Sequence, residues 1–254
     1  FLLRAFLLYI FGDMQAVSKL MRMKGVNGFS PCRMCHIHGV AAPGRPFPLY
    51  TPLFRSNGDS YDPSNLPLRS HSEFMQQAQE VISAPTPARS NELARQYGIN
   101  GVPLLAAISS VSVPDSFPFD FMHLISNIMT TLVAHWTGVF KDLGGEGEAY
   151  FISQEDWSRI GQACKTSGDT IPSAFGSRVP DVASEQWQFK TENWFTFLTF
   201  LAPALLHGRL ASPYYKHFLK FVNIFNLCLS YVLYDDDIEE LRRGCVNWVN
   251  EYER

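Results

Sequence analysis

The first residue with a position suited to chemistry is Asp13, which follows the apolar residues 7–11 and a glycine. We expect residues 7–11 to form a buried strand and residues 16–24 to form a helix after it. An acidic residue between a strand and a helix is common in α/β active sites. Phosphoryl-transfer sites with two metal ions gather several such carboxylates, because hard divalent cations prefer oxygen ligands. Asp13 supplies one ligand, and a helix cap is the simpler interpretation of a single aspartate there.

Two cysteines and a histidine within seven residues form a second candidate site. Cys32, Cys35 and His38 offer two thiolates and one imidazole at a spacing that can wrap a tetrahedral Zn²⁺. The fourth ligand stays open between His36, His71 and a more distant side chain. An unligated thiol pair in a turn and a redox motif are the alternatives. Zinc is favoured because proline, glycine and basic residues surround the pair instead of a thioredoxin-like pattern.

Asp120 and His123 form a third candidate, at the start of a helix that we expect to run from just after Pro118 to about residue 136. Residues three apart share one face of a helix, so the carboxylate and the imidazole could point together at a metal, at a phosphate or at each other. The alternative is an aspartate that caps the helix and a histidine that is packed or solvated one turn later.

Basic residues are concentrated close to Asp13. Residues 14–58 contain six lysines and arginines and no acidic residue, whereas residues 59–254 contain 14 basic and 23 acidic residues. A cluster of positive charge is the usual footprint of a surface that binds nucleic-acid phosphates, and an ordinary solvated face is the alternative. Because the stretch directly follows Asp13, we interpret it as a binding surface with these candidate residues: Lys19, Arg22, Lys24 and Arg33.

The bulk composition indicates a folded protein, and its cysteines fit a reducing compartment. With 254 residues, 46% of them hydrophobic, the chain can bury a substantial core, and its net charge of −3 does not mark the whole chain as a nucleic-acid binder. Five cysteines, mostly scattered, do not resemble a secreted disulfide framework. Two apolar runs, residues 194–206 and 218–233, fall short of the roughly 20 apolar residues that a membrane span needs, so we expect buried helices and no membrane.

Helices dominate the expected secondary structure after a connection rich in proline and glycine over residues 39–67. Capping boxes open two helices, at Ser70 and at Ser153, and Gly98 is the expected stop of a helix that begins at Ser90. Further helices are expected over residues 216–233 and from residue 235 onward. The chain starts and stops in the middle of such patterns, so we expect a fragment of a longer protein.

Five short segments occur in a fixed order along the chain: GDMQA at 12–16, MRMKGVNG at 21–28, CRMC at 32–35, FDFMH at 119–123 and IPSAFGSRVP at 171–180. Taken in this order, they resemble the motifs of CACTA (En/Spm-like) DNA transposases, and the fungal type is the most similar. The resemblance extends over essentially all 254 residues and depends on the combination of motifs.

The resemblance implies a mainly α chain, in which a strand-helix fragment of a ribonuclease-H-like α/β core is followed by a long helical insertion. The expected divisions are a core fragment at 1–28, a Cys/His knuckle with its proline-rich connection at 29–69, and a helical insertion domain at 70–254. In such enzymes two aspartates and a glutamate bind Mg²⁺ or Mn²⁺ and catalyse DNA strand cleavage and strand transfer.

By position, Asp13 matches the second catalytic aspartate, while Asp120 and His123 match an accessory Asp-x-x-His signature. The first aspartate and the final glutamate have no candidate here, and we expect them before residue 1 and after residue 254, so this piece should not cleave DNA alone. The implied partners are transposon-end and target DNA and further copies of the parent protein, in the nucleus. The alternative is a catalytically dead or domesticated DNA-binding protein that zinc stabilises.

Overall fold

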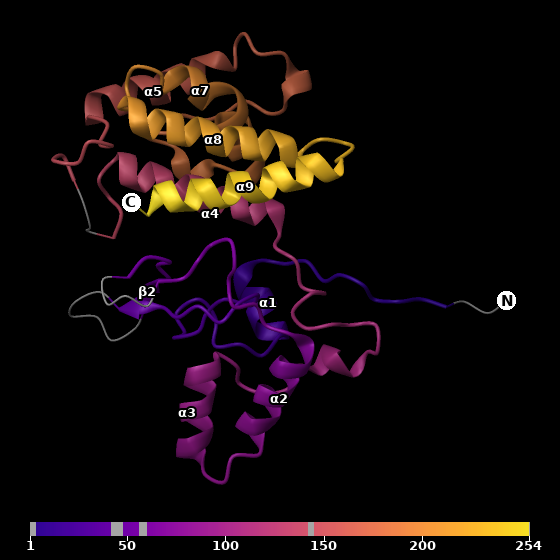
Figure 1. Ribbon diagram of the computed structural model, residues 1–254. Helices are drawn as coiled ribbons and strands as arrows, with labels where there is room; N and C mark the ends of the chain where they lie inside the picture. The colour runs from indigo at the N-terminus through magenta and orange to yellow at the C-terminus, as the bar shows by residue number, and fades with distance from the viewer. Residues whose placement is uncertain (1–3, 42–47, 56–59, 142–144, 254) are drawn as a thin grey trace. The chain divides into compact units, whose positions relative to one another are not determined.

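The computed structural model of the protein describes residues 4–41, 48–55, 60–141 and 145–253 (Figure 1). The described chain is mainly helical, as the sequence predicts. It divides into two compact units, Phe1–Asp120 and Phe121–Tyr252, with the last two residues aside. No helix in the described part of the chain combines the length and the apolar character needed to span a membrane.

The first unit contains three α-helices, one 3₁₀ turn and a small hairpin among its described residues. The elements are α1 (Met14–Leu20), β1 (Val40–Ala41), β2 (Pro48–Tyr50), α2 (His71–Ile82), α3 (Pro87–Tyr97) and η1 (Leu104–Ala107). The two strands pair in antiparallel fashion within the expected connection, of which residues 42–47 and 56–59 lie outside the described residues. Helices α2 and α3 pack as a helical hairpin (Figure 1).

Side-chain caps set the ends of these helices. The Ser70 hydroxyl accepts a hydrogen bond from the Glu73 amide at the start of α2, as the capping box predicts. Helix α3 begins three residues earlier than predicted, because Thr86 is its N-cap and Pro87 suits the first turn. It ends at Gly98, which adopts the left-handed conformation that favours glycine.

The core of the first unit joins α1 to residues far along the chain. Buried Val17 of α1 and Met21, the C-cap residue of that helix, belong to one cluster with Phe74 of α2 and with Ile99 and Phe117. Residues of the expected segments 1–28 and 70–254 therefore share this core. The compact units divide the chain after Asp120 and so follow different boundaries from the three predicted segments.

The prediction of a buried strand over residues 7–11 is wrong for the described structure. These residues have no regular secondary structure, and Leu8, Tyr9 and Phe11 are exposed. A strand needs a ladder of hydrogen bonds to a neighbour, whereas in the described part of the chain one backbone bond links this segment to another, from the Ile10 amide to the Ser116 carbonyl. An apolar run alone does not reveal whether a partner strand exists.

The second unit is helical throughout its regular elements. These are α4 (Phe121–Trp136), α5 (Gln154–Ser167), η2 (Ser173–Phe175), η3 (Gln186–Gln188), α6 (Thr191–Thr196), the π-helical turn η4 (Phe197–Leu201), α7 (Ala202–Leu205), α8 (Ser212–Cys228) and α9 (Asp235–Tyr252). Helices α8 and α9 lie side by side (Figure 1).

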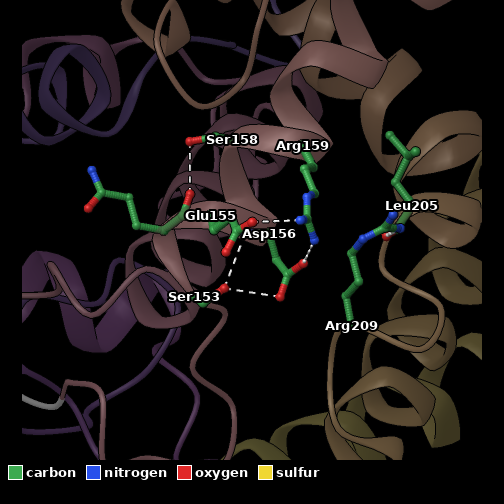
Figure 2. A network of polar contacts seen from close by, with 8 residues as sticks. Ser153, Glu155, Asp156, Ser158, Arg159, Leu205 and Arg209 are labelled. Atoms are coloured by element: carbon green, nitrogen blue, oxygen red, sulfur yellow. Dashed lines mark hydrogen bonds and ion pairs between the residues drawn. The ribbon is translucent and has the colours of Figure 1, made fainter.

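Helix α5 starts at the predicted capping box. The Ser153 hydroxyl accepts from the Asp156 amide and donates to the Asp156 carboxylate, and Arg159 pairs with Glu155 and Asp156 one turn later (Figure 2). Acidic side chains at this end also oppose the positive pole of the helix dipole. The cap turns the apolar face of the helix, including Trp157, into the core.

The core of the second unit gathers one face of each long helix except α9. Helix α8 starts earlier than predicted and contributes Phe218, Phe221, Val222 and Phe225, but residues 229–234 leave the helix and are exposed. Helix α9 begins at the predicted acidic residues, but none of its residues is fully buried. Its half-buried Trp248 packs against this core.

Candidate functional site

Asp13 lies at the N-cap of α1, on the exposed side of the first unit. Its Oδ1 atom accepts a hydrogen bond of 2.6 Å from the Ala16 amide, and this bond satisfies one of the free donors at the helix start. The carboxylate is therefore positioned by a short helix whose inner residue, Val17, is fixed in the core. The cap interpretation of Asp13 is confirmed, and it fixes the group that the resemblance assigns to metal binding.

Three of the four candidate basic residues are exposed beside α1. Lys19 lies in the last turn of α1, while Arg22 and Lys24 follow the helix. Arg22 has a φ angle of 54°. Its backbone carbonyl accepts a hydrogen bond from the Asn100 amide, which fixes the backbone of the loop that carries it. Because these side chains are already exposed, they are accessible to phosphate groups of a bound nucleic acid.

Arg33, the fourth candidate, is buried and already bonded. Its guanidinium donates to the Pro118 carbonyl over 2.8 Å and stacks on the Phe119 ring, with the Arg33 Cζ atom 4.2 Å from the ring centroid. Burial lowers the pKa of the guanidinium. These contacts tie the Cys32–Cys35 turn to the segment before α4, so Arg33 is arranged for structure more than for phosphate binding.

Sequence reasoning missed Arg69, a second buried arginine next to the thiols. Its Nε atom donates to the Cys32 carbonyl over 3.1 Å, and its Nη2 atom donates to the Tyr97 carbonyl over 2.9 Å. It therefore connects the thiol turn to the end of α3. Its place directly before the Ser70 cap is the one local signal that could have drawn attention to it.

Cys32 and Cys35 face each other with their sulfur atoms 3.2 Å apart. The Cys35 thiol donates to Cys32 and lowers the Cys32 pKa to about 6, with a smaller contribution from the positive charge of Arg69. The same hydrogen bond, together with burial, raises the Cys35 pKa. Cys32 thus has a stabilised thiolate, which is the form that binds metals and reacts as a nucleophile.

The neighbouring histidines do not converge on the two sulfur atoms. The His38 ring stacks on Phe29 at a centroid distance of 4.6 Å, and burial lowers its pKa. His36 Nε2 lies 3.1 Å from the Glu73 carboxylate. His71 Nδ1 accepts from the Val113 amide.

The described residues do not assemble a complete metal site. No group of three or more histidine, cysteine, aspartate and glutamate side chains within them is close enough to hold one ion. The thiol pair fits two ligands of a zinc site, and Asp13 fits one ligand of a magnesium or manganese site.

Asp120 and His123 stand at the start of α4. Asp120 is half-buried and immediately precedes the first helical residue, and His123 is exposed in the first turn. The division between the two compact units falls between these residues. The structure therefore places both residues at the start of α4, as the sequence predicts, and their accessory role stays a prediction.

A cavity of about 400 Å³ in the second unit was not anticipated as a site. Residues 167–179 form most of its wall, and Thr196 closes it from α6. This wall includes most of the IPSAFGSRVP segment, which the sequence singled out only through the family resemblance.

Comparison of the chain with protein-family models, with curated proteins and with solved structures gave no match. Functional assignment therefore depends on the residues and their geometry, together with the resemblance of the ordered motifs.

Proposed function

We propose that this chain is part of a cut-and-paste DNA transposase of the CACTA type, in which the first unit holds one catalytic carboxylate next to a DNA-binding surface. The full-length parent would cleave and transfer DNA strands with Mg²⁺ or Mn²⁺, as multimers acting in the nucleus. The observation that carries the proposal is the placement of a fixed, exposed carboxylate, Asp13, at the start of the helix that leads into exposed Lys19, Arg22 and Lys24.

The physical support is that the cations and the carboxylate beside α1 can take two different roles. Exposed cations can hold the phosphate backbone, because binding to DNA releases counterions from it. A carboxylate oxygen near the held phosphate can ligate a divalent metal ion. Asp13 alone cannot form a two-metal site, and the ribonuclease-H-like core to which it would belong is part of this proposal.

A measurement of DNA binding by the 254-residue chain tests the part of the function that it carries. We expect Lys19→Ala/Lys24→Ala to weaken binding to a random duplex and to reduce the slope of log affinity against log salt by about 2, because two phosphate contacts are lost. The matched control is Lys216→Ala/Arg243→Ala, which removes two exposed cations from the second unit.

The control should leave the affinity and the salt slope unchanged. Equal effects of the two double variants would show that binding follows total charge and not the surface beside Asp13. The absence of salt-dependent duplex binding by the wild-type chain would remove the support for this DNA-binding surface. Binding without metal-dependent cleavage by the full-length parent would instead favour the domesticated DNA-binding alternative.

A further inference from the structure

The cavity of about 400 Å³ in the second unit is built by a loop that the proposed function does not use. Its wall includes Ser167, Ser173 and Ser177, whose part of the lining we call the polar end. It shares residues with an apolar hollow of about 270 Å³ beside Phe200 and Leu201, which we call the apolar end. The two volumes share part of their lining, including Phe175, and have the size of small-molecule sites.

Two half-exposed aromatic rings flank the apolar end. Phe175 and Phe200 are 50% and 48% exposed, and their rings meet edge to face with centroids 5.5 Å apart. Phe200 belongs to the π-helical turn η4, a type of turn that is frequent at functional sites. Pro203 helps to explain the turn, because it has no amide hydrogen to donate to the carbonyl one α-helical turn earlier. Exposed aromatic faces beside a cavity are suited to stacking on a planar ligand.

The loop of the polar end is hydrogen-bonded to two side chains of α6. The buried Asn193 side chain donates to the Arg178 carbonyl over 3.2 Å, and Glu192 accepts from the Ser177 amide over 2.8 Å. Gly176, with a φ angle of 111°, lets the loop approach Glu192, where a Cβ atom would lie 3.1 Å from the carboxylate. The cavity wall is therefore anchored to α6 and is not a loose surface loop.

Electrostatics narrows the class of ligand. The guanidinium of Arg178 is already paired with Asp169 at 2.8 Å, and the Glu192 carboxylate lies behind the same loop. A free phosphate at the polar end would face two carboxylates and one neutralised cation. A neutral, planar ring with polar edges fits better, because one of its faces can stack on the Phe175–Phe200 pair while its edges bond to hydroxyl groups.

We propose that this cavity binds an unpaired nucleobase of single-stranded DNA. The base stacks on the pair of rings formed by Phe175 and Phe200, and its polar edge faces the serine hydroxyl groups. This inference deepens the proposed function and rests on it, since it names unpaired DNA as a substrate form. An aromatic side chain of a partner protein would fill the apolar end but would leave the polar end unused.

The test measures the affinity of the 254-residue chain for a labelled oligothymidylate and for a duplex of equal length. Phe175→Ala and Phe200→Ala should each weaken binding of the single strand by fivefold or more, which is the scale of one lost stacking contact. Phe200→Trp keeps an aromatic ring at this position, so it should bind the single strand more tightly than Phe200→Ala and close to the wild-type affinity. Trp187→Ala is the matched control, since it removes a largely exposed ring that does not line the cavity, and it should leave both affinities unchanged.

Single-strand binding at wild-type affinity by both alanine variants would overturn the inference, as would equal losses for the duplex and the single strand. Far-UV circular dichroism confirms that each variant is folded. Displacement of the single strand by thymidine supports the nucleobase, whereas displacement only by N-acetyl-phenylalanine amide assigns the cavity to a peptide and overturns it. Salt-dependent duplex binding is read in the same experiment, so failure of the cavity inference with duplex binding intact leaves the proposed function standing.

Discussion

At the scale of single residues, Asp13 caps α1, and in the proposed function it also ligates a metal ion, two roles that the sequence presents as alternatives. As a helix cap it uses Oδ1, which accepts from the Ala16 amide. As a metal ligand it would use a carboxylate that the cap has already oriented. Capping depends on an oxygen acceptor and metal binding depends mainly on negative charge, so substitutions can separate the two roles.

We predict that Asp13→Ala lowers the free energy of unfolding of the first unit by about 1 kcal/mol, whereas Asp13→Asn changes it by only a few tenths. Asparagine keeps a side-chain oxygen that can accept from the Ala16 amide. Urea unfolding followed by circular dichroism measures both changes. Equal losses in the two variants would show that the charge of Asp13, and not its cap bond, stabilises the helix.

The thiol pair allows a second prediction at this scale. In metal-free protein, alkylation of Cys32 should rise through a pH of about 6, because its thiolate forms there and not near the ordinary pKa of 9.0. Cys35→Ala removes the thiol that donates to Cys32, so the Cys32 pKa should rise and alkylation at pH 7 should slow.

The measurement is mass spectrometry of iodoacetamide adducts against pH, after elemental analysis of the purified protein. If the thiol pair binds zinc, the wild-type protein should contain one zinc ion per chain. The Cys35→Ala variant should lose it. Zinc-free protein from zinc-supplemented growth would contradict it. An alkylation profile of Cys32 centred near pH 9 would contradict the hydrogen bond between the two sulfur atoms.

The site was predictable where its residues act locally and not where they act at long range. Asp13 caps its own helix, so the sequence was sufficient to propose that contact. Arg33 was assigned to phosphate binding, but its hydrogen-bond partner is the Pro118 carbonyl, 85 residues away. The sequence pattern around Arg33 or Arg69 does not predict such a distant hydrogen-bond partner.

At the scale of elements, the caps explain why helix positions were predicted well and the strand was not. Ser70, Ser153 and Gly98 act within one turn of their own positions, and the structure places each as the sequence predicts. A strand over residues 7–11 would need a partner elsewhere in the chain, which no local pattern specifies. The predicted end of α8 is wrong for a related reason. The mostly apolar residues 229–234 resemble the buried face of a helix, but they are exposed.

The end of α3 allows a sharp test of this explanation. Gly98 has a φ angle of 73°, and a Cβ atom there would lie 2.0 Å from the Ser30 carbonyl oxygen. Gly98→Ala should therefore cost clearly more than the roughly 1–2 kcal/mol of left-handed backbone strain. Gly25→Ala is the control in the same unit, because its φ angle is 82° but nothing lies within 4 Å of an added Cβ atom. Similar unfolding midpoints for the two variants would refute the close approach of α3 and Ser30.

At the scale of the whole molecule, each compact unit has a hydrophobic core of its own. Phe74 lies in the core of the first unit, whereas Trp136 and Phe218 lie in that of the second. All five tryptophans of the chain follow residue 120, so tryptophan fluorescence reports on the second unit.

We predict that Phe74→Ala destabilises the first unit by about 3–5 kcal/mol, the usual cost of removing a buried aromatic ring. Circular dichroism should then show an early loss of helix, while the fluorescence transition of the second unit keeps its midpoint. A common shift of both transitions would show that the chain unfolds as one cooperative unit.

The most direct test of the proposed transposase function is strand cleavage by the protein expressed from the complete reading frame. On DNA that carries the transposon ends, we predict nicking that requires Mg²⁺ or Mn²⁺. Asp13→Asn should reduce nicking at least a thousandfold while it keeps the fold and the affinity for DNA. Metal-dependent nicking by Asp13→Asn at the wild-type rate would contradict the role of Asp13, and a complete protein that binds DNA but never nicks it would contradict the enzyme.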